Sequence, residues 1–342
     1  MAVFVLGAGA TRGASFVDPS KNACLPPLDT GFYAQLQRIR TKKHERIIKN
    51  VIQDTVDLFG VNFNVTMETV FTTLEHILRM VHTTGESRDF KRDEIGEKQG
   101  RLMQSIAATL EEALCPEGYE GTKCAFHAKL VEALKAEDEI ISFNYDCLID
   151  ETLKRSTRQV WNARYGYGFN LGQRGANLSG DDHWMPKLPA NKSSTVKLYK
   201  LHGSLHFHQE KRDQEKIKLK RRPYTTQFGN LRFTIIPPES NKRFEEGIFK
   251  GQWYRAGQAL HRAATLVVIG YSFPTSDLHA TALFRVSTKR EALRSLVLVN
   301  PDREARRRAR DVLRRGLSNK TRVLVFDTFK EFAAVDRSLW DA

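Results

Sequence analysis

The feature that most constrains this chain is a pattern that occurs five times, in which a short apolar run ends in a polar or glycine-rich loop. The apolar runs are residues 2–6, 139–143, 196–201, 266–269 and 296–299, and the loops are 7–10 (GAGA), 144–146 (NYD), 202–204 (HGS), 270–273 (GYSF) and Asn300. Apolar strands that alternate with helical patterns predict a mostly parallel sheet with helices on both faces. Ligands of such sheets bind beside the carboxyl ends of the strands, so we expect the five loops to meet at one site.

The expected organisation is a single α/β domain over residues 1–342, with insertions. Apolar residues recur at helical spacing between residues 41 and 114, which predicts a helical insertion or subdomain there, with a loop over the polar stretch 84–100. Residues 155–195 and 208–230 are rich in small polar or charged residues and predict irregular or charged insertions.

The chain carries a large excess of basic residues. Lys and Arg number 54 against 40 Asp and Glu, which gives a formal net charge of +14. Such an excess can attract nucleic acid or another acidic partner. The segments 211–222 and 303–315 concentrate the charge, but they lack the interleaved aromatic residues that stack on bases. A solvated helix face and a contact with nucleic acid or an acidic protein therefore both remain open.

Membrane and zinc-binding classes are not expected. No apolar run approaches the roughly 20 residues that span a bilayer, and the N-terminus lacks the pattern of a secretory signal. The four cysteines form no C-x-x-C pair, so neither a zinc ribbon nor a disulfide framework is expected. These observations predict a cytoplasmic protein with reduced thiols.

The first loop, GAGATRG, is similar to a dinucleotide-binding turn, although its third glycine comes one place later than in G-x-G-x-x-G. Glycine lets backbone N–H groups approach a pyrophosphate closely, and a plain tight turn is the alternative. An acidic residue that binds a ribose is expected about 20 residues further on. Asp18 and Asp29 are both candidates, and the spacing does not choose between them. Together these features predict a Rossmann-like sheet.

The ordered motifs GAGAT, FNYD, LHGS, GYS and VNP resemble those of the sirtuin-like NAD-binding family, from Gly7 to Asn300. The segments PPLDT and TMETVFTTLEH resemble the bacterial antiphage-defence branch more than the protein deacetylases. The chain departs from the family pattern in two ways: Phe143 replaces a glutamine before Asn144, and the zinc-binding cysteine pairs are absent.

The resemblance implies NAD as substrate and a role for each motif. Asn144 would hold the nicotinamide ribose and position water, His202 would be the essential histidine, and Asp146 would help to seat the nicotinamide end. The residues implied at the two phosphate loops and the adenosine ribose are Gly7, Ala8, Gly9, Ala10, Thr11, Gly270, Ser272 and Asn300.

The chemistry of N-glycosidic cleavage supports the same roles. Loss of nicotinamide passes through an oxocarbenium-like state, as in glycoside cleavage. An Asn amide, both donor and acceptor, suits the task of orienting water, and a histidine can take a proton near neutral pH.

Simpler roles remain open for these residues. Asn144, Asp146 and Asp277 could cap helices, and Ser272 and Asn300 could be turn residues. His202 could be structural, or could bind metal with His206 and His208.

The resemblance implies an NAD⁺ glycohydrolase that depletes NAD⁺ in antiphage defence. The alternatives are an NAD-dependent deacylase, an ADP-ribosyltransferase, or an inactive module that senses NAD or ADP-ribose. Because no second effector or sensor domain is expected, control would come from homo-oligomerisation or a partner such as a HerA-type ATPase or an Argonaute-like protein. Residues 41–114 or the arginine-rich helix would supply the interface.

Overall fold

The fold is that of a computed structural model, which describes residues 1–85, 91–115, 123–158, 160–169, 184, 196–210, 213–220, 222–224, 233–236 and 247–341. The expected insertion at 155–195 lies mostly outside these residues, as does much of 208–230. None of the helices within the described ranges is long and apolar enough to cross a bilayer.

Six parallel strands form the central sheet, in the order β3-β2-β1-β7-β8-β9. The strands are β1 (Ala2–Leu6), β2 (Glu139–Ser142), β3 (Lys197–Lys200), β7 (Thr265–Ile269), β8 (Ser295–Val299) and β9 (Arg322–Phe326). The chain builds outward from β1 to β2 and β3, then returns to place β7 on the other side of β1. The strand order therefore reverses between β1 and β7, and a crevice opens at such a point beside the carboxyl ends of the strands.

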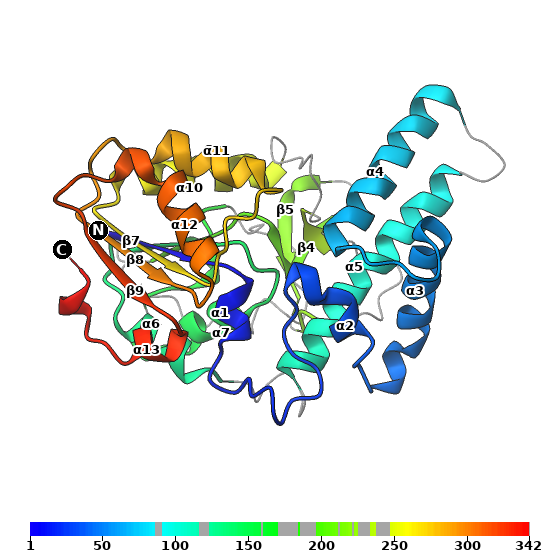
Figure 1. The fold of residues 1–342 in the computed structure, drawn as a ribbon, viewed down its shortest axis with the longest axis horizontal. Helices are drawn as coiled ribbons and strands as arrows, with labels where there is room; N and C mark the ends of the chain where they lie inside the picture. Colours follow the sequence, from blue (N-terminus) through cyan, green and yellow to red (C-terminus); the bar gives the residue numbers. More distant parts are fainter. Residues whose placement is uncertain are drawn as a thin grey trace.

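Helices cover both faces of this sheet (Figure 1). Phe4 and Leu6 pack with α6 (Ala125–Glu132), α7 (Leu148–Arg155) and α13 (Phe329–Ala333). Val3 and Val5 point the other way and pack with α10 (Gly247–Arg262), α11 (Leu278–Ser287) and α12 (Arg303–Val312). All five residues of β1 are buried, as expected for a strand with both faces covered. The predicted Rossmann-like α/β fold is confirmed.

A block of helices packs beside the sheet and forms its own core (Figure 1). It contains α2 (Phe32–Leu36), α3 (Glu45–Phe59), α4 (Met67–Thr84) and α5 (Arg92–Leu114). The prediction of a loop over residues 84–100 is wrong from residue 92 onward, because α5 begins there. Most residues of this first part of α5 are good helix formers, and Asp93 and Glu94 favour a first turn. The limits 41 and 114 of an insertion stay a prediction.

A second, antiparallel sheet lies between the central sheet and the helical block (Figure 1). It consists of β4 (Gly203–Glu210), β5 (Asp213–Leu219) and β6 (Phe233–Ile235). The expectation of irregular structure over 208–230 is therefore wrong for β5. Ile217 and Leu219 alternate with lysines and are buried, so a charged stretch still has one apolar strand face.

The short elements are α1 (Ala8–Arg12), α8 (Ala163–Gly166), η1 (Asp29–Gly31), η2 (Lys42–His44), η4 (Arg314–Gly316) and η5 (Arg337–Leu339).

Candidate functional site

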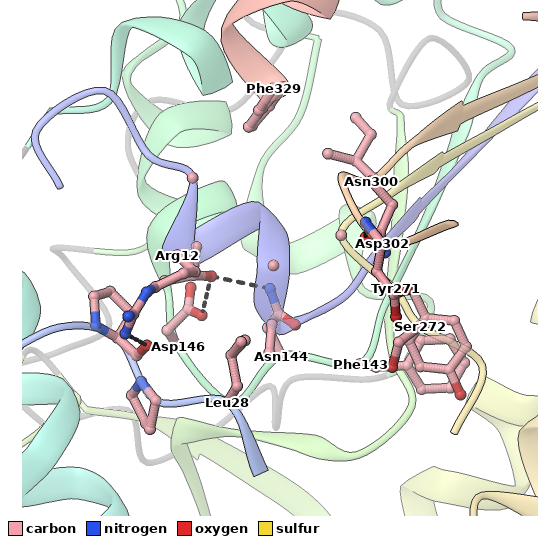
Figure 2. A pocket seen from close by; sticks show the side chains of 18 of the residues that line it. Arg12, Leu28, Phe143, Asn144, Asp146, Tyr271, Ser272, Asn300, Asp302 and Phe329 are labelled. Atoms are coloured by element: carbon pink, nitrogen blue, oxygen red, sulfur yellow. Dashed lines mark hydrogen bonds between the residues drawn. The ribbon is translucent and has the colours of Figure 1, made fainter. Parts of the chain in front are cut away.

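A cavity of about 1070 Å³ lies at the carboxyl ends of the central strands. All five predicted loops contribute to its wall, through Ala8 and Gly9, Asn144 to Asp146, His202, Gly270 to Ser272, and Asn300. The helical block closes the other side with Phe32, Met67, Glu68, Ile106 and Leu110. Figure 2 shows Asn144 and Asp146 near Arg12, with Asn300 and Asp302 further along the cavity. The expectation that the loops meet at one site is met by this arrangement.

The glycines of the first and fourth loops allow two backbones to touch. A Cβ on Gly270 would lie 2.1 Å from the amide nitrogen of Ala10, and one on Gly9 would lie 2.7 Å from Gly270 Cα. Gly9 N–H donates to the Gly270 carbonyl at 2.9 Å, and Ala10 N–H donates to the Gly7 carbonyl at 2.8 Å. Gly7 and Ala10 do not line the cavity. These glycines thus serve loop packing first, and two N–H groups expected at the pyrophosphate are engaged within the protein.

A hydrogen-bond network joins Asn144, Thr11 and Asp146 (Figure 2). Thr11 Oγ1 donates to Asp146 Oδ2 at 2.7 Å, so it accepts from Asn144 Nδ2 at 3.0 Å. Asn144 Nδ2 also donates to the Gly7 carbonyl at 2.9 Å. These partners determine the orientation of the amide. Asn144 Oδ1 is buried and has no hydrogen-bond partner in the part of the chain that the structure describes. The Asn144 side chain lines the cavity, while this oxygen itself is buried from solvent.

His202 sits in an aromatic corner of the same cavity. Phe143 meets the imidazole edge-on, with ring centroids 5.1 Å apart, and stacks on Tyr271 at 4.2 Å. Phe143, the departure from the family pattern, therefore supports the histidine. His202 Nε2 lies 3.6 Å from Asp277 Oδ2, which also accepts from the Tyr271 hydroxyl at 2.9 Å. Burial, and then the charge of Asp277, raise the pKa of Tyr271 well above its ordinary value, so this hydroxyl remains a donor.

The far end of the cavity is polar and contains arginine. Asn300 Oδ1 accepts from Asp302 N–H at 3.0 Å, so Asn300 shapes a turn and also lines the cavity. Arg308 Nε donates to the Ser272 carbonyl at 3.0 Å and holds the fourth loop. Arg12 lines the cavity on the side of Asp146 (Figure 2), donates to the Pro26 carbonyl at 3.0 Å, and has its pKa lowered by burial and by Arg38.

Of the two acidic candidates near the first loop, Asp18 lies outside the cavity. Asp18 bonds to Ser20 and Lys21 and does not line it. The side chain of Asp29 lies outside what the structure describes. Asp146 accepts from Leu148 N–H at 3.0 Å and so helps to start α7, in addition to its bond with Thr11.

The alternative of a histidine metal site finds no support near His206. Its ring is fully buried, with Nδ1 2.8 Å from Ser204 Oγ and Nε2 2.8 Å from the Tyr167 hydroxyl. Across the described ranges, no group of three or more His, Cys, Asp or Glu side chains is placed to hold a metal ion.

Several residues of the cavity were not predicted as site residues from the sequence, among them Asp277, Arg12 and Glu68. Asp277 was expected to cap a helix, and it does accept from Ala280 N–H, but its second oxygen faces His202. Arg12 follows the glycine loop directly and could have been found there. Glu68 comes from the first turn of α4, and no sequence pattern placed it near the strand ends.

Comparison with known families gives one match. A family model described as a SIR2-like domain matches residues 138–321, more than half of the chain. This range contains the second to fifth loops. No curated protein matches the chain.

Proposed function

The chain belongs to the SIR2-like family, a family that implies NAD binding, and from this premise we propose that it is an NAD⁺ glycohydrolase. It would cleave NAD⁺ with water to nicotinamide, ADP-ribose and a proton. The observation that carries the proposal is the placement of Asn144 and His202 together in the wall of one cavity at the carboxyl ends of the strands. An amide side chain in this wall, both donor and acceptor, suits a ribose hydroxyl or the attacking water.

The main task of the protein in this reaction is to position the ribose and the attacking water. The C–N bond breaks with its electron pair going to nicotinamide, which leaves as a neutral molecule, and the ribose carbon becomes oxocarbenium-like. Water then forms the new C–O bond and loses a proton. In the proposal Asn144 orients the ribose or water, and His202 accepts the proton.

Two features support hydrolysis over the other family reactions. The cysteine pairs that would build the zinc module beside an acyl-lysine cleft are absent from the sequence, which disfavours a deacylase. A module that only senses NAD would need neither the Asn144 acceptor nor a histidine beside a carboxylate. We extend the proposal to a defensive role, in which infection releases the activity and NAD⁺ is depleted.

The direct test is chromatographic. Purified protein is incubated with NAD⁺, and nicotinamide, ADP-ribose and cyclic ADP-ribose are quantified for wild type, Asn144→Ala and His202→Ala. His82→Ala, at an exposed position on α4, is the matched control. Release of nicotinamide by wild type and His82→Ala, but not by Asn144→Ala or His202→Ala, supports the proposal. Equal background from all four proteins contradicts it for the isolated chain, and an acylated peptide as co-substrate then tests the deacylase alternative.

A restraining or activating partner is also proposed, at the outer face of α12. Arg303, Arg307 and Arg310 are exposed and spaced so that they share one face, which we call the arginine stripe. Arg306 and Arg308 instead bond to Asp327 and the Ser272 carbonyl. The stripe suits an acidic partner, either nucleic acid or protein.

A further inference from the structure

The environment of His202 includes a carboxylate placed to control its ring. Asp277 is 4% exposed and His202 is 8% exposed, so the pair is largely shielded from water. Asp277 Oδ1 accepts from Ala280 N–H at 3.3 Å at the start of α11, while Oδ2 lies 3.6 Å from His202 Nε2. The helix start therefore holds the carboxylate in place, and one oxygen remains directed at the imidazole.

The backbone and the ring of His202 are each held by a further contact. The backbone carbonyl of His202 accepts from Ile236 N–H at 2.9 Å and anchors the main chain, and Phe143 packs edge-on against the ring. Tyr271 connects Phe143 to Asp277, because its ring stacks on Phe143 and its hydroxyl donates a hydrogen bond to Asp277 Oδ2. A ring held in this way keeps the same nitrogen toward the carboxylate.

We propose that Asp277 is a positioning residue for His202. Its carboxylate, whose Oδ2 lies 3.6 Å from Nε2 and so just beyond hydrogen-bond length, favours the Nε2–H tautomer of the neutral imidazole by electrostatic attraction, so that Nδ1 is the nitrogen that accepts a proton. When Nδ1 takes the proton from the nucleophile, the imidazolium forms beside Asp277, which remains ionised. This is the logic by which a buried aspartate orients a catalytic histidine. The role of Nδ1 as proton acceptor rests on the proposed hydrolysis, whereas the preference for the Nε2–H tautomer does not depend on it.

Other titratable groups near the ring must be considered for the pH dependence. Tyr145 lies with its ring centroid 6.2 Å from that of His202, and Tyr271 bonds to Asp277. Asp146 and Glu68 line the same cavity, and the charge of Glu68 acts on Tyr271. Among these, Asp277 is the carboxylate with a close contact to the imidazole nitrogen in the described chain. Removing the charge of Asp277 should therefore change the pKa of His202 more than removing the charge of Glu68 does.

The decisive variant is Asp277→Asn. Asparagine caps a helix as well as aspartate does and can still accept from Tyr271, so the fold should persist. Loss of the charge makes the imidazolium less favourable, so the acid limb of the kcat profile should move to lower pH. We expect kcat to fall roughly 10- to 100-fold, with little change in KM, because the base is less well oriented. Asp336→Asn, at an exposed cap that does not line the cavity, is the matched control.

A second readout needs no activity. In protein labelled with ¹⁵N-histidine, the resonances that disappear in His202→Ala are those of His202. At a pH above the pKa of this histidine, wild type should show the Nε2–H tautomer. Asp277→Asn should weaken this preference, and Asp336→Asn should not. An Nδ1–H tautomer in wild type overturns the proposal, as does a preference that Asp277→Asn leaves unchanged. If no nicotinamide is released, the proposed hydrolysis fails, but the NMR result still decides the role of Asp277.

Discussion

Gly270→Ala tests the close contact between the first and fourth loops. Gly270 has φ +63, a left-handed conformation that costs a residue with a Cβ about 1–2 kcal/mol. The new Cβ would also lie 2.1 Å from Ala10 N and 2.3 Å from Gly9 C, which are backbone atoms that cannot rotate away. Overpacking of this kind costs about 1–3 kcal/mol, and parting the loops loses the Gly9–Gly270 hydrogen bond, about 1 kcal/mol.

The summed cost is about 3–6 kcal/mol. An average unfolding entropy of about 2.1 cal/mol/K per residue gives about 0.7 kcal/mol/K for 342 residues, so Tm should fall by about 4–8 °C. The assay is thermal unfolding followed by circular dichroism, with NAD binding measured by calorimetry. Because the loops line the cavity, NAD binding should weaken together with stability.

Two matched variants separate the contributions. Gly60 has φ +84 and ψ 168, a backbone conformation that is largely restricted to glycine, but no atom lies within 4 Å of the place its Cβ would take. Gly60→Ala therefore carries only the conformational cost, about 1–3 kcal/mol, or about 1–4 °C in Tm. Gly9→Ala carries the close approach without a left-handed backbone. Gly270→Ala should therefore be the least stable of the three. If it is no worse than Gly60→Ala, the argument from loop contact is wrong.

Three further predictions concern the site, the thiols and the charged surface. Thr11→Val removes the hydroxyl that links Asn144 to Asp146, and should lower kcat/KM for NAD⁺ about tenfold in the release assay, since that bond orients the amide. Burial acts to raise the pKa of the Cys124 thiol, but His127 and backbone N–H groups outweigh it and lower the pKa to about 6 from an ordinary 9.0. The folded thiolate therefore adds stability above about pH 9 that is lost as the pH falls through about 6, so wild type should gain unfolding free energy over Cys124→Ser across that interval. Reversing the charge of the arginine stripe should weaken the binding of labelled DNA and reduce its salt dependence.

Each of these has a result that would contradict it. A Thr11→Val enzyme with wild-type kinetics would remove the hydroxyl from the positioning network. Parallel stability curves for wild type and Cys124→Ser between pH 6 and 9 would mean that the folded thiol is not ionised. Unchanged DNA affinity and salt dependence after charge reversal would exclude the arginine stripe as a nucleic-acid contact, and the same test with Lys42 and Lys43, exposed in η2, is the control.

The strands and their polar ends were predictable from local sequence. A strand that is buried on both faces has a continuous apolar sequence. The predicted ranges agree to within one residue at each end with five observed strands, namely β1, β2, β3, β7 and β8. Parallel strands bring their carboxyl ends to one edge, so a shared site followed from the fold class alone. By contrast, the first part of α5 and strand β5 are charged, and their apolar faces become evident only against the neighbours that cover them.

Sequence by itself therefore determined the fold class, the family and the loops that line the cavity, because each depends on patterns within a few adjacent residues. Only the tertiary structure decided which atoms in those loops are engaged. It directs Gly9 toward Gly270, orients the Asn144 amide through Thr11, and brings Asp277 to His202. The physical reason is that hydrogen bonds and close contacts between distant segments depend on ångström-scale placement, which spacing along a chain does not contain.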